Sequence, residues 1–144
     1  MRRQVVLRVI AKLFIPFILL FALYVQFHGD YGPGGGFQAG VIFAAAFVLY
    51  TLIWGVDEAR RVARPAVLEA GMAIGVLLYA GTGVASLLAG GNYLQYSVLG
   101  HDPVHGQHLG ILLVELGVGV TVAAVMISIF LHFAGRPRSG DDPA

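Results

Sequence analysis

Two glutamates lie within apolar stretches of the chain, where an acidic side chain is costly and is therefore a candidate ligand for protons or cations. Glu115 lies in the run Leu-Leu-Val-Glu-Leu-Gly-Val-Gly, about two turns into the last apolar stretch. Removal from water favours the protonated carboxyl, so proton uptake near neutral pH is the expected chemistry. Gly117 and Gly119 allow a second helix or a file of water to approach it. The alternative is a carboxyl that stays protonated, or hydrogen-bonded to another helix, and serves packing only.

Glu69 is the second candidate for an ion path and lies about one turn into the third apolar stretch. It follows arginines at positions 60, 61 and 64. An ion pair at the membrane surface, or a favourable charge near a helix N-terminus, therefore also explains it. Asp57 and Glu58 are expected to be solvated loop charges.

Four histidines fall in the loops that the apolar stretches leave on one side of the chain: His28, His101, His105 and His108. Histidine titrates near neutral pH, so these side chains could form a rim that collects protons. The spacing of the last three would bring imidazoles together on a helix, but Pro103 and Gly106 are expected to interrupt that helix. No metal site is therefore predicted, and ordinary loop residues at an interface are the alternative.

Other chemistry finds little support in the residue types. Cysteine is absent, which excludes disulfides, thiolate metal sites, iron–sulfur clusters and cysteine nucleophiles. No nucleophile–base pair, metal motif or cofactor-binding loop is recognisable. We therefore expect no catalytic residues, no cofactor, no nucleic-acid partner and no enzyme activity in this chain itself.

The composition is that of a membrane protein. The 144 residues are 58% hydrophobic and only 12% charged, and the mean hydropathy is +0.80. Soluble domains carry about a quarter charged residues, so the soluble globular and disordered classes are excluded.

Four stretches are long enough to cross a bilayer, which needs about 20 residues. They cover residues 5–27, 37–56, 66–89 and 108–133. Pro16 is expected to kink the first or to mark its entry. We predict an all-α, multi-pass protein of the cell membrane, with one four-helix transmembrane domain over 1–134 and a short cytoplasmic tail over 135–144.

Charge sets the expected orientation. All nine Lys and Arg residues fall at the N-terminal end, between the second and third stretches, or in the C-terminal tail, and none falls in loops 28–36 and 90–107. The positive-inside rule therefore predicts two cytoplasmic termini. No small-residue cleavage site follows Phe27, so the first stretch is expected to remain as a helix rather than to be a signal peptide.

The most unusual segment is the outer loop between the first two stretches, His28-Gly-Asp-Tyr-Gly-Pro-Gly-Gly-Gly-Phe37-Gln-Ala-Gly40. Its proline and glycines prevent a continued helix and allow the backbone to approach other backbone closely. A close-packed connector, a backbone that handles ions directly, and an interface with another subunit are the three interpretations. It is not a P-loop, because no Gly-Lys-Ser/Thr follows.

This segment resembles the MnhB-type (also called MrpB-type) subunit of the multisubunit sodium/proton antiporters of the Mrp/Mnh family. The resemblance rests on the pattern HG-x3-PGGGF-x2-G, followed by the Ala-rich run 44–47, and on chain length, four spans and the position of the motif. Its residues are His28, Gly29, Pro33, Gly34, Gly35, Gly36, Phe37 and Gly40. The same domain recurs in ion-translocating modules of membrane-bound hydrogenases.

The resemblance implies an accessory membrane subunit of a complex that exchanges cytoplasmic Na⁺ for external H⁺ and so serves sodium and pH homeostasis. The expected partners are large antiporter-like subunits, which carry the main proton channels, small membrane subunits and the lipid bilayer. Glu115, Glu69 and His28 are the candidates for an ion or proton path. An equivalent subunit of a hydrogenase or respiratory complex is one alternative. A free-standing four-span transporter is another, although those usually carry their membrane glutamate in the first span, which here has none.

Overall fold

The computed structural model describes residues 5–136 and is helical throughout its regular structure, with no strand in that range. The helices are α1 (Val5–His28), α2 (Gly36–Trp54), α3 (Val56–Val62), α4 (Pro65–Leu88) and α5 (Pro103–Ala134), with a 3-10 turn, η1, at Tyr96–Val98. The helices α1, α2, α4 and α5 are long and apolar enough to cross a membrane. The predicted all-α fold with four spans is confirmed. Positions 137–144 of the predicted tail lie outside the described residues.

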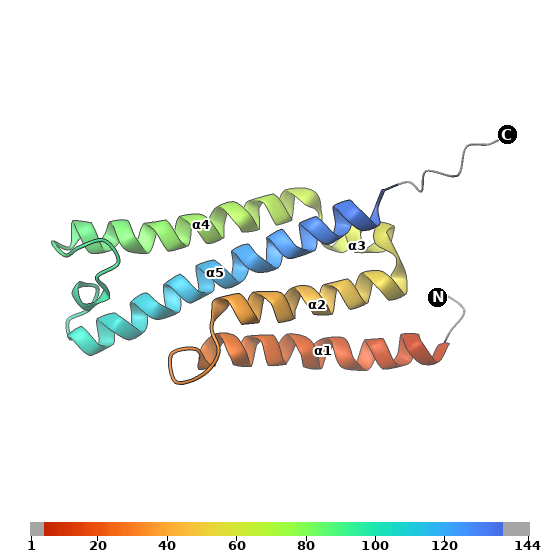
Figure 1. Ribbon diagram of the computed structural model, residues 1–144, viewed down its shortest axis with the longest axis horizontal. Coiled ribbons are helices and arrows are strands. Elements are labelled where there is room, and N and C mark those ends of the chain that lie inside the picture. Colours follow the sequence, from red (N-terminus) through yellow and green to blue (C-terminus); the bar gives the residue numbers. More distant parts are fainter. Residues whose placement is uncertain (1–4, 137–144) are drawn as a thin grey trace.

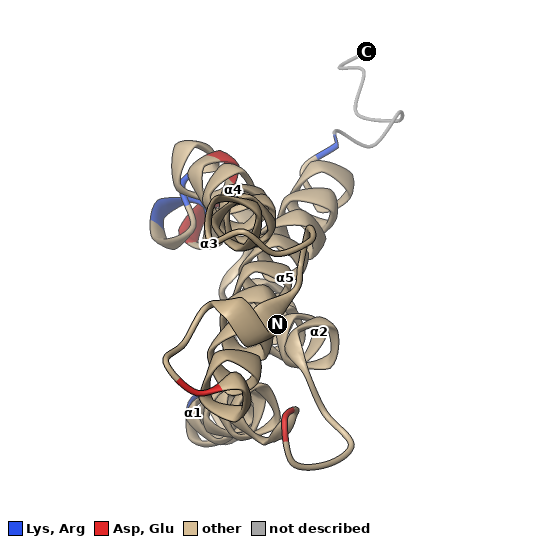
Figure 2. Ribbon diagram, turned by 90° about the vertical axis from the view of Figure 1, so that its left-hand side faces the viewer, with Lys and Arg blue, Asp and Glu red and all other residues tan. Residues whose placement is uncertain are grey.

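The four long helices form a row in the order α1, α2, α5, α4 (Figure 1). Each packs mainly against its neighbour in that row, and α5 takes the central place between α2 and α4. Seen from one end, the row curves into a crescent, with α1 and α4 on the same side (Figure 2). The chain is therefore an open array of helices rather than a closed four-helix bundle.

Glycines set the closeness of this packing. A Cβ built on Gly36 would overlap the backbone carbonyl of Glu115, and one on Gly75 would lie 2.6 Å from the carbonyl oxygen of Gly117. These positions bring α2 and α4 against α5 backbone to backbone, as small residues do in membrane helices. Gly75 of α4 thus serves a contact within the chain, whereas Gly81 on the same helix faces open space.

The start of the fourth span is five residues earlier than predicted, and the expected break at Pro103 and Gly106 is wrong. Pro103 is the first residue of α5, where a missing N–H costs nothing. Gly106 is buried, and its N–H donates to the carbonyl of Asp102 (2.9 Å). Its missing side chain leaves room for the Tyr96 carbonyl of η1, 2.5 Å from where a Cβ would be. The glycine therefore permits a contact and does not end the helix.

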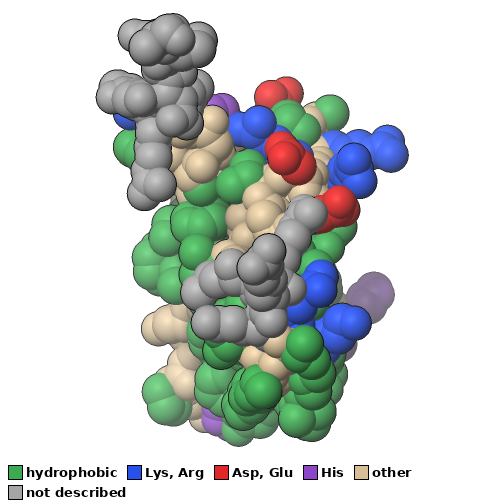
Figure 3. Space-filling view, turned by 90° about the vertical axis from the view of Figure 1, so that its right-hand side faces the viewer, with side chains coloured by type: hydrophobic (Ala, Val, Ile, Leu, Met, Phe, Trp, Pro, Cys, Tyr) green, Lys and Arg blue, Asp and Glu red, His purple; other side chains and the backbone are tan. Residues whose placement is uncertain are grey.

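The segment between the second and third spans contains the short helix α3, where a loop was expected. Gly55, at φ 98°, ends α2 and lets the chain turn. Ala59 is completely buried in a core cluster with residues of α2, α4 and α5. Arg61 pairs with Glu58 (Nη1–Oε1 3.0 Å) on the exposed face. Figure 3 shows charged side chains gathered on this end of the molecule.

The bilayer can be placed against this basic end. Arg60 donates to the carbonyl of Leu131 (Nη2–O 3.4 Å), which puts the hydrocarbon boundary near that level of α5. Glu115 precedes Leu131 by 16 residues, about 24 Å along a helix. The hydrocarbon core is about 30 Å thick, so we expect Glu115 to lie inside it, closer to the far boundary than to the basic end.

Candidate functional site

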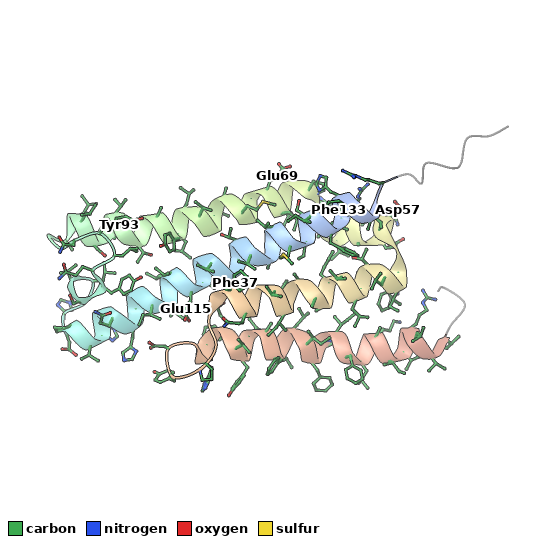
Figure 4. All side chains as sticks on the ribbon, viewed as in Figure 1. Phe37, Asp57, Glu69, Tyr93, Glu115 and Phe133 are labelled. Atoms are coloured by element: carbon green, nitrogen blue, oxygen red, sulfur yellow. The ribbon has the colours of Figure 1, made fainter. Side chains whose placement is uncertain are left out.

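The side chain of Glu115 lies against the glycine loop, which connects α1 to α2 (residues 29–35). This partly buried carboxylate fills the space that two missing side chains leave. A Cβ on Gly29 would lie 2.5 Å from its Oε1 atom, and one on Gly35 would lie 3.1 Å from the same atom. Figure 4 shows Glu115 on α5 beside this loop. The structure thus joins the leading acidic candidate and the glycine motif, two features that are far apart in the sequence.

The glycine loop folds back over the end of α1. The N–H of Gly35 donates to the carbonyl of Val25 (3.2 Å), and a Cβ on Gly34 would lie 2.8 Å from that same carbonyl oxygen. Gly35 itself has φ 117°, a conformation that side chains other than hydrogen strongly disfavour. The repeated glycines are therefore needed for a tight backbone return at the depth of Glu115.

The remaining motif residues divide into two groups. Gly36 and Gly40 pack against the α5 backbone, where a Cβ on Gly40 would lie 2.7 Å from the carbonyl oxygen of Gly119. Pro33 and Phe37 are exposed, and Phe37 retains 62% of its accessible surface. The glycines thus serve contacts inside the chain, while the proline and the phenylalanine point away from it.

The outer end of the glycine loop is fixed to α5 by a second polar contact. Nδ1 of His108 lies within ion-pair distance of Oδ2 of Asp30. The ring of Tyr31 stacks on the imidazole of His108, with 6.0 Å between ring centroids. His108 is one of the histidines expected at the outer rim, and its contact with Asp30 joins it to the glycine loop. His105 is exposed one turn earlier on the same helix.

The other predicted path residues, His28 and Glu69, lie in different parts of the structure. His28 ends α1, where its ring stacks on Tyr24 (5.2 Å between centroids) and its carbonyl accepts hydrogen bonds from the loop. Glu69 is exposed at the basic end and lines a small pocket of about 170 Å³ with Arg60 and His132. Glu69 therefore belongs to the opposite surface of the spanning region.

One polar residue near the site is not predicted from the sequence. Gln26 of α1 is only 5% exposed, and its Nε2 atom has no hydrogen-bond partner among the described residues. Its Oε1 atom lies 2.5 Å from where a Cβ of Gly119 would be. A single glutamine near the end of an apolar stretch gives no sequence signal, because the same residue is ordinary at a membrane surface.

The start of α2 lies beside Glu115. The N-terminus of α2 is at Gly36, and the helix dipole there favours a negative charge. Within residues 5–136 no group of three His, Asp or Glu side chains could hold a metal ion.

Comparison with known proteins gives the family. Residues 6–128 match the model of the MnhB family, described as a domain related to the MnhB subunit of the Na⁺/H⁺ antiporter. The chain belongs to the MnhB family. It is also 37% identical over 135 residues to proteins of Staphylococcus aureus strains Newman and JH1, each named "Putative antiporter subunit mnhB2". These alignments cover 92% of this chain and 95% of each relative. With its four apolar helices, this MnhB chain is a multi-pass membrane protein.

Proposed function

We propose that this MnhB chain is an accessory membrane subunit of a multisubunit antiporter that exchanges cytoplasmic Na⁺ for external H⁺. The family match over residues 6–128 supports membership of such a complex. The observation that carries a part in transport is the Glu115 carboxylate seated against Gly29 and Gly35, inside the spanning region.

In this proposal the subunit contributes one proton-binding group close to the outer surface. Protons reach Glu115 from the outer side past His108 and Asp30, whose contact closes the outer end of the glycine loop. His28 shapes the loop at the end of α1, and Glu69 lies at the inner surface. Such a short chain has one acid at this depth and no basic residue level with it, which is too little to couple two ions alone. The large subunits of the complex therefore carry the main ion path.

Reconstitution tests the accessory role directly. Three vesicle preparations are compared: the complete complex, the complex without this chain, and this chain alone. A sodium gradient is imposed and internal pH is followed. Sodium-dependent proton movement is expected from the complete complex. It should be lost or strongly reduced in the complex without this chain, and this chain alone should show none. Robust exchange by the chain alone would contradict the proposal, and so would unchanged exchange by a complex that lacks it.

A further inference from the structure

The concave side of the crescent carries an apolar cleft of about 330 Å³ between α1 and α4. Leu23 of α1 and Val67 of α4 form its two walls, and residues of α2 and α5 form its floor. Both wall residues are exposed, at 48% and 61% of their accessible surface. The cleft is therefore open toward the surroundings of the chain and is not part of a closed core.

Six of the residues that line the cleft are small. They come from three helices and are Ala22, Ala39, Gly40, Gly119, Ala123 and Ala124. Small residues let a membrane helix approach closely, and they are enriched where membrane helices associate. Lipid chains need no such surface, because they adapt to any apolar relief.

One side chain in the lining can form directional hydrogen bonds, and its N–H donor has no acceptor among the described residues. Gln26 lines the cleft and is nine-tenths buried, and its amide nitrogen has no hydrogen-bond partner within residues 5–136. A half-turn of the amide about its last side-chain torsion exchanges nitrogen and oxygen at little cost, so a donor can be presented to the cleft. An unpaired amide in hydrocarbon is costly, so an acceptor on an occupant would stabilise it.

The depth of Gln26 decides which occupant can supply that acceptor. It lies 14 residues from Lys12 on α1, about 21 Å along the helix, and level with Gly119 of α5. With a hydrocarbon core of about 30 Å that begins at the level of Lys12, we expect Gln26 to lie about 9 Å below the far boundary. Acyl chains carry no hydrogen-bond acceptor at this depth, whereas a transmembrane helix can carry a hydroxyl, amide or carboxyl oxygen there.

We propose that this cleft receives a transmembrane helix of another subunit, one that places a side-chain oxygen against the amide of Gln26. The partner helix lies over α5 between α1 and α4 and inserts its side chains into the cleft. This inference rests on the proposed multisubunit function. Beyond that function, it specifies which face of the chain the partner helix covers and which residue sets the depth of that helix.

Cross-linking in native membranes tests the cleft, and the absence of cysteine makes a single label unique on this chain. Leu23→Cys in the cleft and Phe21→Cys, also exposed on α1 but outside the cleft, are each labelled with a benzophenone maleimide within the complete complex. After irradiation, Leu23→Cys is expected to form an adduct that maps to a membrane helix of one other subunit. Phe21→Cys is expected to give that adduct at least about 5-fold less. Adducts with lipid only, an adduct between two copies of this chain, or equal yields from both positions would overturn the proposal.

A second measurement tests Gln26. Gln26→Leu in the Leu23→Cys background removes the amide and is expected to lower the adduct yield several-fold. Thr51→Val is the matched control, because the buried Thr51 hydroxyl already donates to the carbonyl of Phe47 within α2 (2.9 Å). An unchanged adduct yield in Gln26→Leu would overturn the role of the amide. If no other subunit co-purifies with the chain, the proposed function itself fails; a complex that transports but gives lipid adducts contradicts the cleft alone.

Discussion

At the scale of single residues, Glu115 occupies the space that side chains on the glycines of the loop would need. The carboxylate lies where side chains at positions 29 and 35 would be, and its backbone carbonyl lies where a side chain at Gly36 would be. Close packing alone therefore accounts for much of the glycine pattern. The same packing holds the carboxyl at one place and depth, so a structural loop and a transport residue are compatible.

Gly35→Val tests the structural part of this arrangement. Gly35 has φ 117°, where a β-branched residue is strained by about 1–3 kcal/mol, and the new side chain would also meet Glu115. We expect a clear loss of assembled complex on blue-native gels. Gly81→Val, at a glycine that faces open space, is the control and should leave assembly unchanged. Full assembly of Gly35→Val with loss of transport would instead assign ion handling to the loop backbone.

Sequence reasoning finds Glu115 because an acid in apolar sequence is conspicuous, and it finds the loop because the triple glycine is rare. It does not join them, since 80 residues separate Gly35 from Glu115 and no local spacing reports that contact. The pairing of Asp30 with His108 was missed for the same reason. Contacts between loops and distant helices depend on how the helices are staggered, which hydropathy alone does not determine.

At the scale of helices, the α4–α5 contact depends on Gly75 of α4 and Gly117 of α5, since backbone of the other helix lies where a side chain on either would be. A Cβ on Gly75 would lie 2.6 Å from the carbonyl oxygen of Gly117 and 2.9 Å from the backbone nitrogen of Thr121, and neither atom can move without shifting α5. Gly75→Ala is therefore expected to destabilise the chain by about 1–3 kcal/mol, as overpacking does. Gly81→Ala on the same helix is the matched control and should be neutral or slightly stabilising. Thermal unfolding in detergent measures both, and equal midpoints would contradict the packing account.

The contact between His108 and Asp30 is expected to hold the glycine loop on α5. His108→Ala removes the ion pair and the stacked Tyr31 contact together, so amide hydrogen exchange in residues 29–35 should become several-fold faster. His105→Ala, at an exposed position one turn away, serves as the control. Unchanged exchange in His108→Ala would show that the glycine packing alone fixes the loop.

The helix boundaries show where periodicity and composition were sufficient to predict the ends of a span. The first three spans begin and end within two residues of prediction, because long apolar runs are bounded by glycine, proline or charge. The start of α5 was missed because proline and glycine were taken as breaks, whereas here proline begins the helix and glycine admits the Tyr96 carbonyl. The short helix α3 was missed because seven residues carry too little periodicity.

At the scale of the whole molecule, the distribution of charge predicts the orientation in the membrane. The described Lys and Arg residues lie at one end: Arg8, Lys12, Arg60, Arg61, Arg64 and Arg136. The start of α1 and the end of α5 lie at that same end (Figure 1), as an even number of spans requires. The positive-inside rule then predicts that this end is cytoplasmic. Reporter fusions at the C-terminus and within the 90–107 loop should give opposite readings, and an external signal from the C-terminal fusion would contradict this orientation.

The open crescent explains how so small a chain can serve a large assembly. Two helices stand at the ends of the row with apolar faces that the chain itself leaves uncovered, including Phe17 and Phe21 on α1 and Leu77 on α4. Lipid or neighbouring subunits cover such faces in a membrane. We propose that Glu115, held against the glycine loop, is the group through which the chain acts on transport.

Sodium-dependent proton exchange by Glu115→Gln in the complete complex tests that central claim most directly. The substitution keeps the volume and hydrogen bonding of the side chain but cannot release a proton. Assembly on blue-native gels should match wild type, while exchange in everted vesicles should be reduced several-fold or shifted along the pH axis. Glu69→Gln, at the opposite surface, is the matched control and should exchange ions as wild type does. Wild-type exchange across the whole pH range in Glu115→Gln would contradict the account and leave Glu115 a packing residue.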